Sequence, residues 1–317
     1  MNTPETRCGF VAIIGAPNAG KSTLVNQLVG TKVSIVTQKV QTTRFPVRGI
    51  AMAEEAQMIL VDTPGIFKPR RRLDRAMVRS AWSGAEDADC VVLLIDTAAQ
   101  LAVKGGGEVK ATAADYKAVE DVEMIIAGLQ QAGRKVILAL NKIDLMKSEN
   151  LLAIADELFK TGVVEDVLMI SADKGHGVKD LKILLAKRMP PSPWLYPEDQ
   201  AADAPVRILA AEITREKLFL RVHEELPYAA AVVTTEFTDK ADGSVRIEQT
   251  VFVERDGQRA IVLGKGGQTL KWIGQKSREE LGKLLDRQVH LFLTVKVDEK
   301  WSDDRALYAQ FGLDYNS

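Results

Sequence analysis

A glycine-rich segment near the start of the chain has the pattern of a phosphate-binding loop. It fits G-x-x-x-x-G-K-[ST], and its residues are Gly15, Ala16, Pro17, Asn18, Ala19, Gly20, Lys21 and Ser22. Glycines let successive backbone N–H groups turn toward phosphate oxygens, and the helix that follows adds partial positive charge. We expect Lys21 to reach the β- and γ-phosphates, Ser22 to ligate Mg²⁺ through its hydroxyl, and Thr23 to join the nucleotide contacts.

Two later segments could complete a site for Mg²⁺ and the γ-phosphate. A polar loop over residues 37–45 contains Thr42 and Thr43. A threonine of such a loop can close onto both groups, and Thr43 is the predicted ligand, with Thr42 as the alternative. Asp62 ends an apolar run and is followed by Thr63, Pro64 and Gly65. We expect Asp62 to hold Mg²⁺ through a water and the N–H of Gly65 to bond a γ-phosphate oxygen. Lys21, Thr43 and Gly65 are the expected catalytic residues.

A third group of residues has the spacing that recognises guanine. Asn141, Lys142 and Asp144 form N-K-x-D directly after the apolar run 135–140. The Asp144 carboxylate can accept two hydrogen bonds from guanine, whereas adenine presents no such donor pair. Asn141 can bond the base edge and tether the phosphate loop, and the stem of Lys142 can cover the ring. Ser171 and Ala172 follow the next apolar run, where a backbone N–H could bond guanine O6. The order of these motifs predicts a GTPase.

Two residues refine the chemistry expected of that GTPase. Ile66 follows Gly65, at a position where some GTPases place a glutamine that orients the attacking water. We therefore expect slow intrinsic turnover, with water positioned by the backbone, another residue or a partner. Asn18 lies inside the phosphate loop. In related GTPases with this asparagine, a bound K⁺ supplies the charge of an arginine finger, and K⁺ is a hypothesis here.

The second half of the chain contains a G-x-x-G pattern. Its residues are Gly264, Lys265, Gly266 and Gly267, and Lys271 follows in the next predicted helix. Such a loop between an apolar segment and a helix is typical of KH domains, which clamp about four nucleotides of a strand. Residues 245–297 hold ten Lys or Arg against six Asp or Glu. This local positive charge, in a chain of formal net charge −1, favours an RNA contact at the clamp.

The motifs need particular elements around them. Apolar runs predict strands over residues 10–14, 47–52, 57–61, 90–96, 135–140 and 167–170, and a short strand is expected over 33–36. Helices are expected over 23–29 and 179–187, whereas residues 98–112 have no clear period and are expected to be a loop, with helix resuming near 117. In the second half we expect helices over 212–226 and 268–285 and strands over 229–237, 245–253 and 289–297.

Domain organisation and location follow from length and composition. The chain has 317 residues, 46% of them hydrophobic, which suits two domains. We place the first domain at residues 1–189, a proline-rich extended linker at 190–205, and the second domain with its tail at 206–317. Cys8 and Cys90 have no metal spacing, which suits a reducing cytoplasm. No signal peptide or membrane span is apparent. The basic stretch 68–79 is interpreted as a solvated helix face, with phosphate-backbone contact as the alternative.

A GTPase motif set followed by a proline-rich segment and a KH domain resembles the Era family of bacterial ribosome-assembly GTPases. The resemblance includes the motifs above and the segments 41–44, 224–228, 295–297 and 301–304. It implies an α/β P-loop NTPase, mostly parallel with helices on both faces, followed by an α+β type II KH domain. It also implies GTP-gated binding to 16S ribosomal RNA during 30S maturation, and a peripheral inner-membrane fraction beside the cytoplasmic one. The chain departs from the family pattern at residues 98–117, which resemble an insertion.

The sequence favours three other functions less strongly. A GTPase coupled to tRNA modification or to another assembly step would be expected to carry an added catalytic domain or a C-terminal modifying cysteine. A P-loop kinase would leave the N-K-x-D motif without a role. A scaffold that holds GTP without hydrolysing it stays open, and no stable protein oligomer is predicted.

Overall fold

The computed structural model describes residues 6–37, 39, 42–104, 110–146, 149–222 and 226–316. The chain divides into two compact units. The first contains residues up to Ser34, Thr43–Asp203 and the segment from Phe311 onward; the second contains Ile35–Thr42 and Ala204–Gln310. Each unit is described by itself below.

In the described residues, the first unit forms a seven-stranded sheet of order β6-β5-β4-β1-β3-β2-β7. Its strands are β1 (Arg7–Ile14), β2 (Val47–Ala53), β3 (Ala56–Asp62), β4 (Cys90–Asp96), β5 (Val136–Asn141), β6 (Val164–Met169) and β7 (Ala202–Asp203). The strands β6, β5, β4, β1 and β3 pair in parallel, whereas β2 is antiparallel to β3 and to β7. Parallel strands place their carboxyl ends at one edge, where ligands bind in folds of this class.

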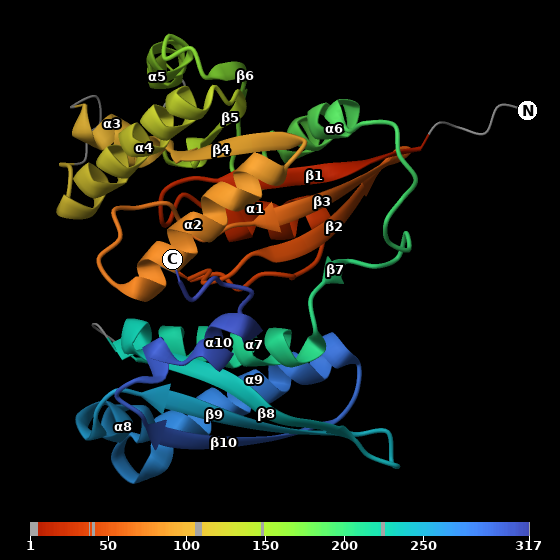
Figure 1. Cartoon of the computed structure of the whole chain (residues 1–317), viewed down its shortest axis with the longest axis vertical. Helices are drawn as coiled ribbons and strands as arrows, with labels where there is room; N and C mark the ends of the chain where they lie inside the picture. The colour runs from red at the N-terminus through yellow and green to blue at the C-terminus, as the bar shows by residue number, and fades with distance from the viewer. Residues whose placement is uncertain are drawn as a thin grey trace, which may run out of the picture. The chain divides into compact units, whose positions relative to one another are not determined.

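Helices cover both faces of this sheet (Figure 1). One core contains side chains of α1 (Lys21–Val29) and α6 (Val178–Arg188). The opposite core contains side chains of α2 (Arg72–Asp87), α4 (Ala113–Ala132) and α5 (Glu149–Phe159). The central strands have buried side chains on both faces, as expected of a parallel sheet between two helical layers.

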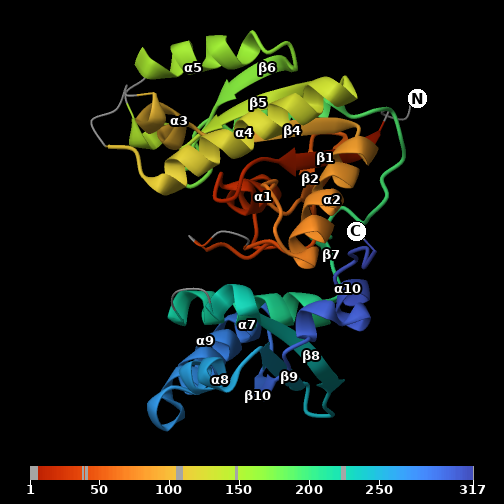
Figure 2. The same cartoon turned by 60° about the vertical axis from the view of Figure 1, so that its left-hand side comes forward.

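The second unit is smaller and has an α+β fold, with helices packed on a sheet (Figure 2). Its sheet has the order β10-β9-β8, with β8 (Ala230–Asp239) antiparallel and β10 (Val289–Val297) parallel to β9 (Val245–Val253). The helices α7 (Val206–Arg221) and α9 (Gln268–Leu285) pack against each other and against the sheet. The helix α8 (Asp256–Leu263) precedes α9, and α10 (Arg305–Gln310) follows the 3-10 turn η4 (Trp301–Asp303).

Most predicted elements are confirmed, and the segment 33–36 is an exception. It is irregular and not a strand. The Asn26 side chain takes the place of a neighbouring strand, because its Oδ1 accepts from the N–H groups of Val33 (2.8 Å) and Ser34 (2.9 Å), and its Nδ2 donates to the Ser34 carbonyl (2.8 Å).

The prediction of a loop over residues 98–112 is wrong in its first part. Residues Thr97–Val103 form the helix α3, whose first N–H groups are capped by Asp96. The helix α4 begins at Ala113, earlier than expected, because Thr112 and Asp115 form a capping box. Residues 105–109 lie outside the described ranges.

Three further elements also differ from the prediction. The apolar segment before G-x-x-G is the helix α8, which is too short for the spacing of its apolar residues to predict. The helix predicted over 212–226 is α7; it begins at Val206 and ends at Arg221, while residues 223–225 lie outside the described ranges. The strand predicted over 167–170 is β6, Val164–Met169.

The proline-rich stretch is irregular, with a turn in which the Gln200 N–H donates to the Pro197 carbonyl (3.1 Å), and it is fastened to the first unit. The Gln57 side chain, which is fully buried, accepts from the N–H groups of Leu195 (2.9 Å) and Tyr196 (3.0 Å) and donates to the Tyr196 carbonyl (2.8 Å). The stretch ends in β7, which pairs with β2. This segment is therefore a structural part of the first unit up to Asp203.

Two other segments belong to a different unit from the one that their position in the sequence suggests. In the second unit, Val36 N donates to Glu216 (3.0 Å) and Arg215 donates to the Thr42 carbonyl. In the first unit, the Phe311 ring stacks on Phe45 with centroids 5.2 Å apart. The polar loop and the C-terminal segment thus each group with the unit that is distant in sequence.

Candidate functional site

The predicted phosphate-binding loop lies between β1 and α1, at the carboxyl edge of the sheet. Gly20 has φ 100°, and a Cβ there would lie 2.4 Å from the Asn141 amide nitrogen. A Cβ on Gly15 would lie 2.3 Å from the Leu94 carbonyl oxygen. Both positions therefore require glycine, and the loop curls as a phosphate cradle must.

Lys21 is buried under this loop. Its Nζ donates to the carbonyls of Gly15 (3.1 Å) and Ala16 (2.9 Å), and only 6% of the residue is exposed. Burial lowers the pKa of Lys21 to about 8, opposed by the negative charge of Asp62. A phosphate brought to this ammonium group would favour its charged form.

Three oxygen-bearing side chains meet beside the loop, and they are the predicted metal ligands. Ser22 Oγ lies 2.9 Å from Thr43 Oγ1, which donates to Asp62 Oδ2 at 3.3 Å. Burial raises the pKa of Asp62, opposed by the nearby hydroxyls of Ser22, Ser34 and Thr43 and by the Lys21 charge. The second carboxylate oxygen, Oδ1, is buried and has no hydrogen-bond partner. Two hydroxyls and an unsatisfied carboxylate oxygen fit Mg²⁺, which prefers oxygen ligands.

The alternative threonine, Thr42, is engaged elsewhere. Its hydroxyl contacts the Thr37 hydroxyl (2.7 Å) and donates to the Lys39 carbonyl (2.7 Å). It is not grouped with Ser22 and Asp62, since it belongs to the second unit. The geometry within the first unit therefore favours Thr43.

Gly65 lies close to the phosphate-binding loop. A Cβ on Gly65 would lie 2.9 Å from Pro17 Cγ and 3.0 Å from Pro17 N. The next residue, Ile66, donates its N–H to the Gly15 carbonyl at 3.1 Å. Ile66 and Phe67 are buried, so this position presents apolar side chains where some GTPases have a glutamine.

Asn141 ties together the two loops that would hold the ends of a nucleotide. Its Nδ2 donates to the Ala19 carbonyl (2.8 Å), and its Oδ1 accepts from the Ala172 N–H (2.9 Å). The tether to the phosphate loop is as the sequence predicts. Of the two candidate donors to guanine O6, the Ala172 N–H donates to Asn141 and the Ser171 N–H donates to the His176 carbonyl (3.0 Å).

Asp144 is exposed on the 3-10 turn η1 (Ile143–Leu145), where a base could approach it. A hydrogen bond from the Ser171 hydroxyl keeps the pKa of Asp144 below its usual value. Its carboxylate is therefore an anionic acceptor at neutral pH, as recognition of two guanine donors requires. Lys142 precedes this turn with φ 66°.

The G-x-x-G motif of the second unit joins α8 to α9 through the turn η3 (Lys265–Gly267). Gly264 has φ 71°, and a Cβ there would lie 2.3 Å from Thr269 Oγ1. Gly266 and Gly267 also have positive φ, but nothing lies within 4 Å of a Cβ on either. The first glycine is thus required by packing, and the last two leave open space where a strand's backbone could approach.

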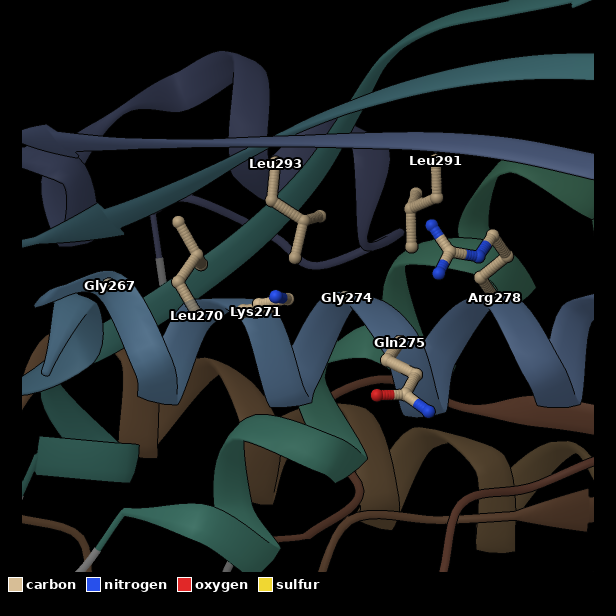
Figure 3. Close-up of a pocket in the computed structure, with 8 residues that line it drawn as sticks. All are labelled: Gly267, Leu270, Lys271, Gly274, Gln275, Arg278, Leu291 and Leu293. Atoms are coloured by element: carbon tan, nitrogen blue, oxygen red, sulfur yellow. The ribbon is translucent and has the colours of Figure 1, made fainter.

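A groove runs from this motif along α9 and the edge strand β10 (Figure 3). It is lined by Gly267, Leu270, Lys271, Gly274, Gln275, Arg278, Leu291 and Leu293. Figure 3 shows Leu270, Leu291 and Leu293 facing the space between helix and strand, with Arg278 beside Leu291. The predicted residues Gly267 and Lys271 therefore belong to a longer surface with apolar walls and cationic side chains.

Six residues of this groove were not predicted from the sequence: Leu270, Gly274, Gln275, Arg278, Leu291 and Leu293. A signal was present, because positions 267, 271, 274 and 278 recur at helical spacing and 291 and 293 alternate along a strand.

Within the described ranges, no helix has the length and apolar character to cross a membrane.

The comparisons with known proteins also find a GTPase part and a KH part in this chain. Residues 10–142 match the model of a family described as 50S ribosome-binding GTPase, and residues 225–302 match the KH domain model. A GTPase Era of Caulobacter vibrioides is 65% identical over 314 residues, covering 99% of this chain and 98% of the relative. One from Maricaulis maris is 55% identical and both chains are covered completely.

Among solved structures, Era in complex with MgGDPNP and nucleotides 1506–1542 of 16S ribosomal RNA is similar at 37% identity. Its TM-score is 0.85, and the match covers 97% of this chain and 99% of that one. A variant of the Aquifex aeolicus Era bound to GDP·AlF4⁻ matches with the same identity, TM-score and coverage. The chain belongs to the Era family of GTPases.

Proposed function

We propose that this protein is a GTP-hydrolysing switch that binds 16S ribosomal RNA through its KH domain and assists maturation of the 30S subunit. The observation that carries the proposal is the combination of both sites in one chain. A phosphate loop with a guanine-recognition motif occupies the first unit, and a G-x-x-G groove occupies the second. The related Era structure holds MgGDPNP and 16S ribosomal RNA together.

In the proposed nucleotide site, each residue has a distinct role. The loop N–H groups bind phosphate oxygens, and Lys21 bonds the β- and γ-phosphates. Ser22 and Thr43 would hold Mg²⁺ directly and Asp62 through a water; the ion would neutralise charge on the β- and γ-phosphates. The Gly65 N–H orients the γ-phosphate, and Asp144 selects guanine.

The two buried residues after Gly65 bear on catalysis. Ile66 and Phe67 carry no group that could orient a water, so backbone groups or a partner must do so and intrinsic turnover is slow. Asn18 has φ 62° within the phosphate loop, and we propose K⁺ beside it as a source of positive charge. Equal rates of GTP hydrolysis in sodium and potassium salts would remove K⁺ from the mechanism.

For RNA, the groove of the second unit offers what a single strand requires. Open glycines admit the sugar–phosphate backbone, Lys265 and Lys271 supply charge, and the leucines provide apolar contact for bases. The description of the matching GTPase family names the 50S subunit, but that model covers only residues 10–142. We assign the 30S subunit because the full-length relative was solved with 16S ribosomal RNA.

The test is to measure both activities on the purified full-length chain. Phosphate release from GTP is followed with and without 30S particles, and binding to an RNA of the 1506–1542 region is measured with GTP, GDP and no nucleotide. We expect slow hydrolysis, and RNA affinity that depends on the nucleotide. Binding of GTP without any phosphate release would leave a non-hydrolysing scaffold instead.

The remaining assignments are proposals of the same kind. We propose a cytoplasmic protein with a peripheral inner-membrane fraction and no stable oligomer, organised as a GTPase domain, a proline-rich segment and a KH domain. Cell fractionation and light scattering test these points.

A further inference from the structure

We propose that Asp96 is a positioning residue of the nucleotide site, which holds Lys142 in place over the base and is itself fixed by the helix α3. This inference rests on the proposed guanine-nucleotide site and adds a residue that none of its sequence motifs contains. It also gives a role to the start of the segment 98–117, where the chain departs from the family pattern.

One oxygen of Asp96 is directed at the base-recognition loop. Asp96 is the last residue of β4 and is the register partner of Asn141 at the end of β5. Lys142 Nζ donates to Asp96 Oδ2 at 2.5 Å, and the Lys142 and Asp96 side chains are 32% and 19% exposed. A charge-assisted bond between partly buried groups restricts the lysine far more than an exposed ion pair would.

The other oxygen of Asp96 is directed at α3. Asp96 Oδ1 accepts from the N–H groups of Ala98 (3.1 Å) and Ala99 (3.2 Å), which makes Asp96 the N-cap of that helix. Because both oxygens are engaged on opposite sides, the carboxylate cannot rotate without losing a partner. The orientation presented to Lys142 is therefore set by α3.

The helix α3 is itself held in the first unit. Thr97, Ala99 and Gln100 are buried, and the helix contacts α4, α5 and η1. Lys104, after its last turn, forms an ion pair with Glu157 of α5. This part of the segment 98–117 therefore supports the base-recognition loop through its contact with η1.

The consequence concerns the apolar stem of Lys142. With its ammonium group fixed on Asp96, the four-carbon stem stays beside Asp144, where it can cover one face of the base. Without that anchor the ammonium group would turn toward solvent and the stem would leave the base exposed. Asp96 therefore acts on affinity, whereas Asp144 acts on the choice of base.

The experiment is a double-mutant cycle on the full-length protein, with GDP affinity as the readout. Asp96→Asn keeps an oxygen for the α3 cap, since Asn caps helices as well as Asp does, but removes the anion facing Lys142. Asp96→Ser also keeps a capping oxygen and is too short to reach the lysine. Lys142→Met keeps an apolar stem without its charge.

We expect each single variant to lose GDP affinity roughly tenfold, a loss of the size expected for one charge-assisted bond. Melting temperature should stay near that of the unchanged protein. The Asp96→Asn/Lys142→Met double variant should bind no more weakly than the weaker single variant, and the preference for GDP over xanthosine diphosphate should be unchanged.

Wild-type affinity for Asp96→Asn, or losses that multiply in the double variant, would overturn the inference. The Asp144→Asn variant keeps the two hypotheses apart. If it retains full GDP affinity and selectivity, the guanine-recognition assignment fails; if it changes base preference while Asp96→Asn behaves as wild type, only the role of Asp96 fails.

Discussion

The nucleotide site and the RNA groove are built in opposite ways. In the first, buried polar side chains bond backbone groups and one another: Lys21 bonds the loop carbonyls, Thr43 bonds Asp62, and Asn141 bonds two loops at once. In the second, the lining is mostly glycine and leucine, and the cationic groups lie at an open surface. Polar networks fix geometry and specify one ligand, whereas an apolar groove with backbone access tolerates many bases. Substitutions should therefore change selectivity at one site and occupancy at the other.

The largest effect should come from Asp144→Asn. Xanthine replaces a guanine donor with an acceptor, which an asparagine amide can satisfy and an aspartate cannot. GTP affinity should fall at least about a hundredfold while xanthosine triphosphate becomes the preferred ligand. Competition binding with both nucleotides measures this. Asp156→Asn, at another exposed acidic position, is the control; unchanged GTP preference in Asp144→Asn would contradict the specificity assigned to this site.

The next effect concerns the clamp, where Gly266→Asp should weaken RNA binding by roughly a hundredfold. A Cβ at Gly266 meets nothing within 4 Å, and Asp tolerates positive φ better than most residues. The variant should therefore fold and place a negative charge against the phosphate backbone. Gly266→Asn is the matched control, since it has the same shape without the charge and should lose much less. Equal losses in both would show that bulk, and not charge, matters there.

A smaller effect is expected from filling the groove. Gly274 faces Leu293, 3.5 Å from a Cβ built on the glycine, so Gly274→Val should narrow the groove and reduce RNA affinity roughly tenfold. Gly282→Ala is the control, because it also removes a glycine from the interior of α9 but lies outside the groove. RNA affinity equal to that of the control would mean that bases do not enter here.

The smallest effect is a pH dependence of nucleotide binding. Because the pKa of Lys21 is lowered to about 8 and bound phosphate favours the charged lysine, binding takes up a proton above that pH. GTP affinity should therefore fall roughly fourfold between pH 7 and pH 8.5. Isothermal titration in two buffers of different ionisation heat measures the proton uptake. An affinity that is flat over this range would indicate that Lys21 is charged throughout; the RNA groove should show no such dependence.

The sequence predicts the nucleotide site more completely than the RNA groove. The motifs of the nucleotide site are contiguous, so Lys21 could be placed in the loop that follows a strand, and Asp62 and Asn141 next to the end of a strand, from local pattern alone. The contacts that Asp96, Asn26 and Gln57 make with distant residues or with backbone groups leave no local pattern. In the groove, Gly264 and Lys265 were found through their motif, but Gly274 and Leu293 become neighbours only when α9 packs on β10. The helix α3 could not be predicted, because its N-cap Asp96 is also the last residue of β4 and no separate residue marks its start.

The attachment of the proline-rich stretch has a practical consequence for dissecting the protein. A GTPase fragment that stopped at Met189 would remove the backbone groups of Leu195 and Tyr196 that bond the Gln57 side chain, leaving it only the weaker contacts with the sulfur atoms of Cys8 and Met52. It would also remove β7 and uncover the edge of β2, and bare strand edges promote aggregation. A fragment ending at Asp203 avoids both defects, so a soluble isolated GTPase should be sought with that terminus.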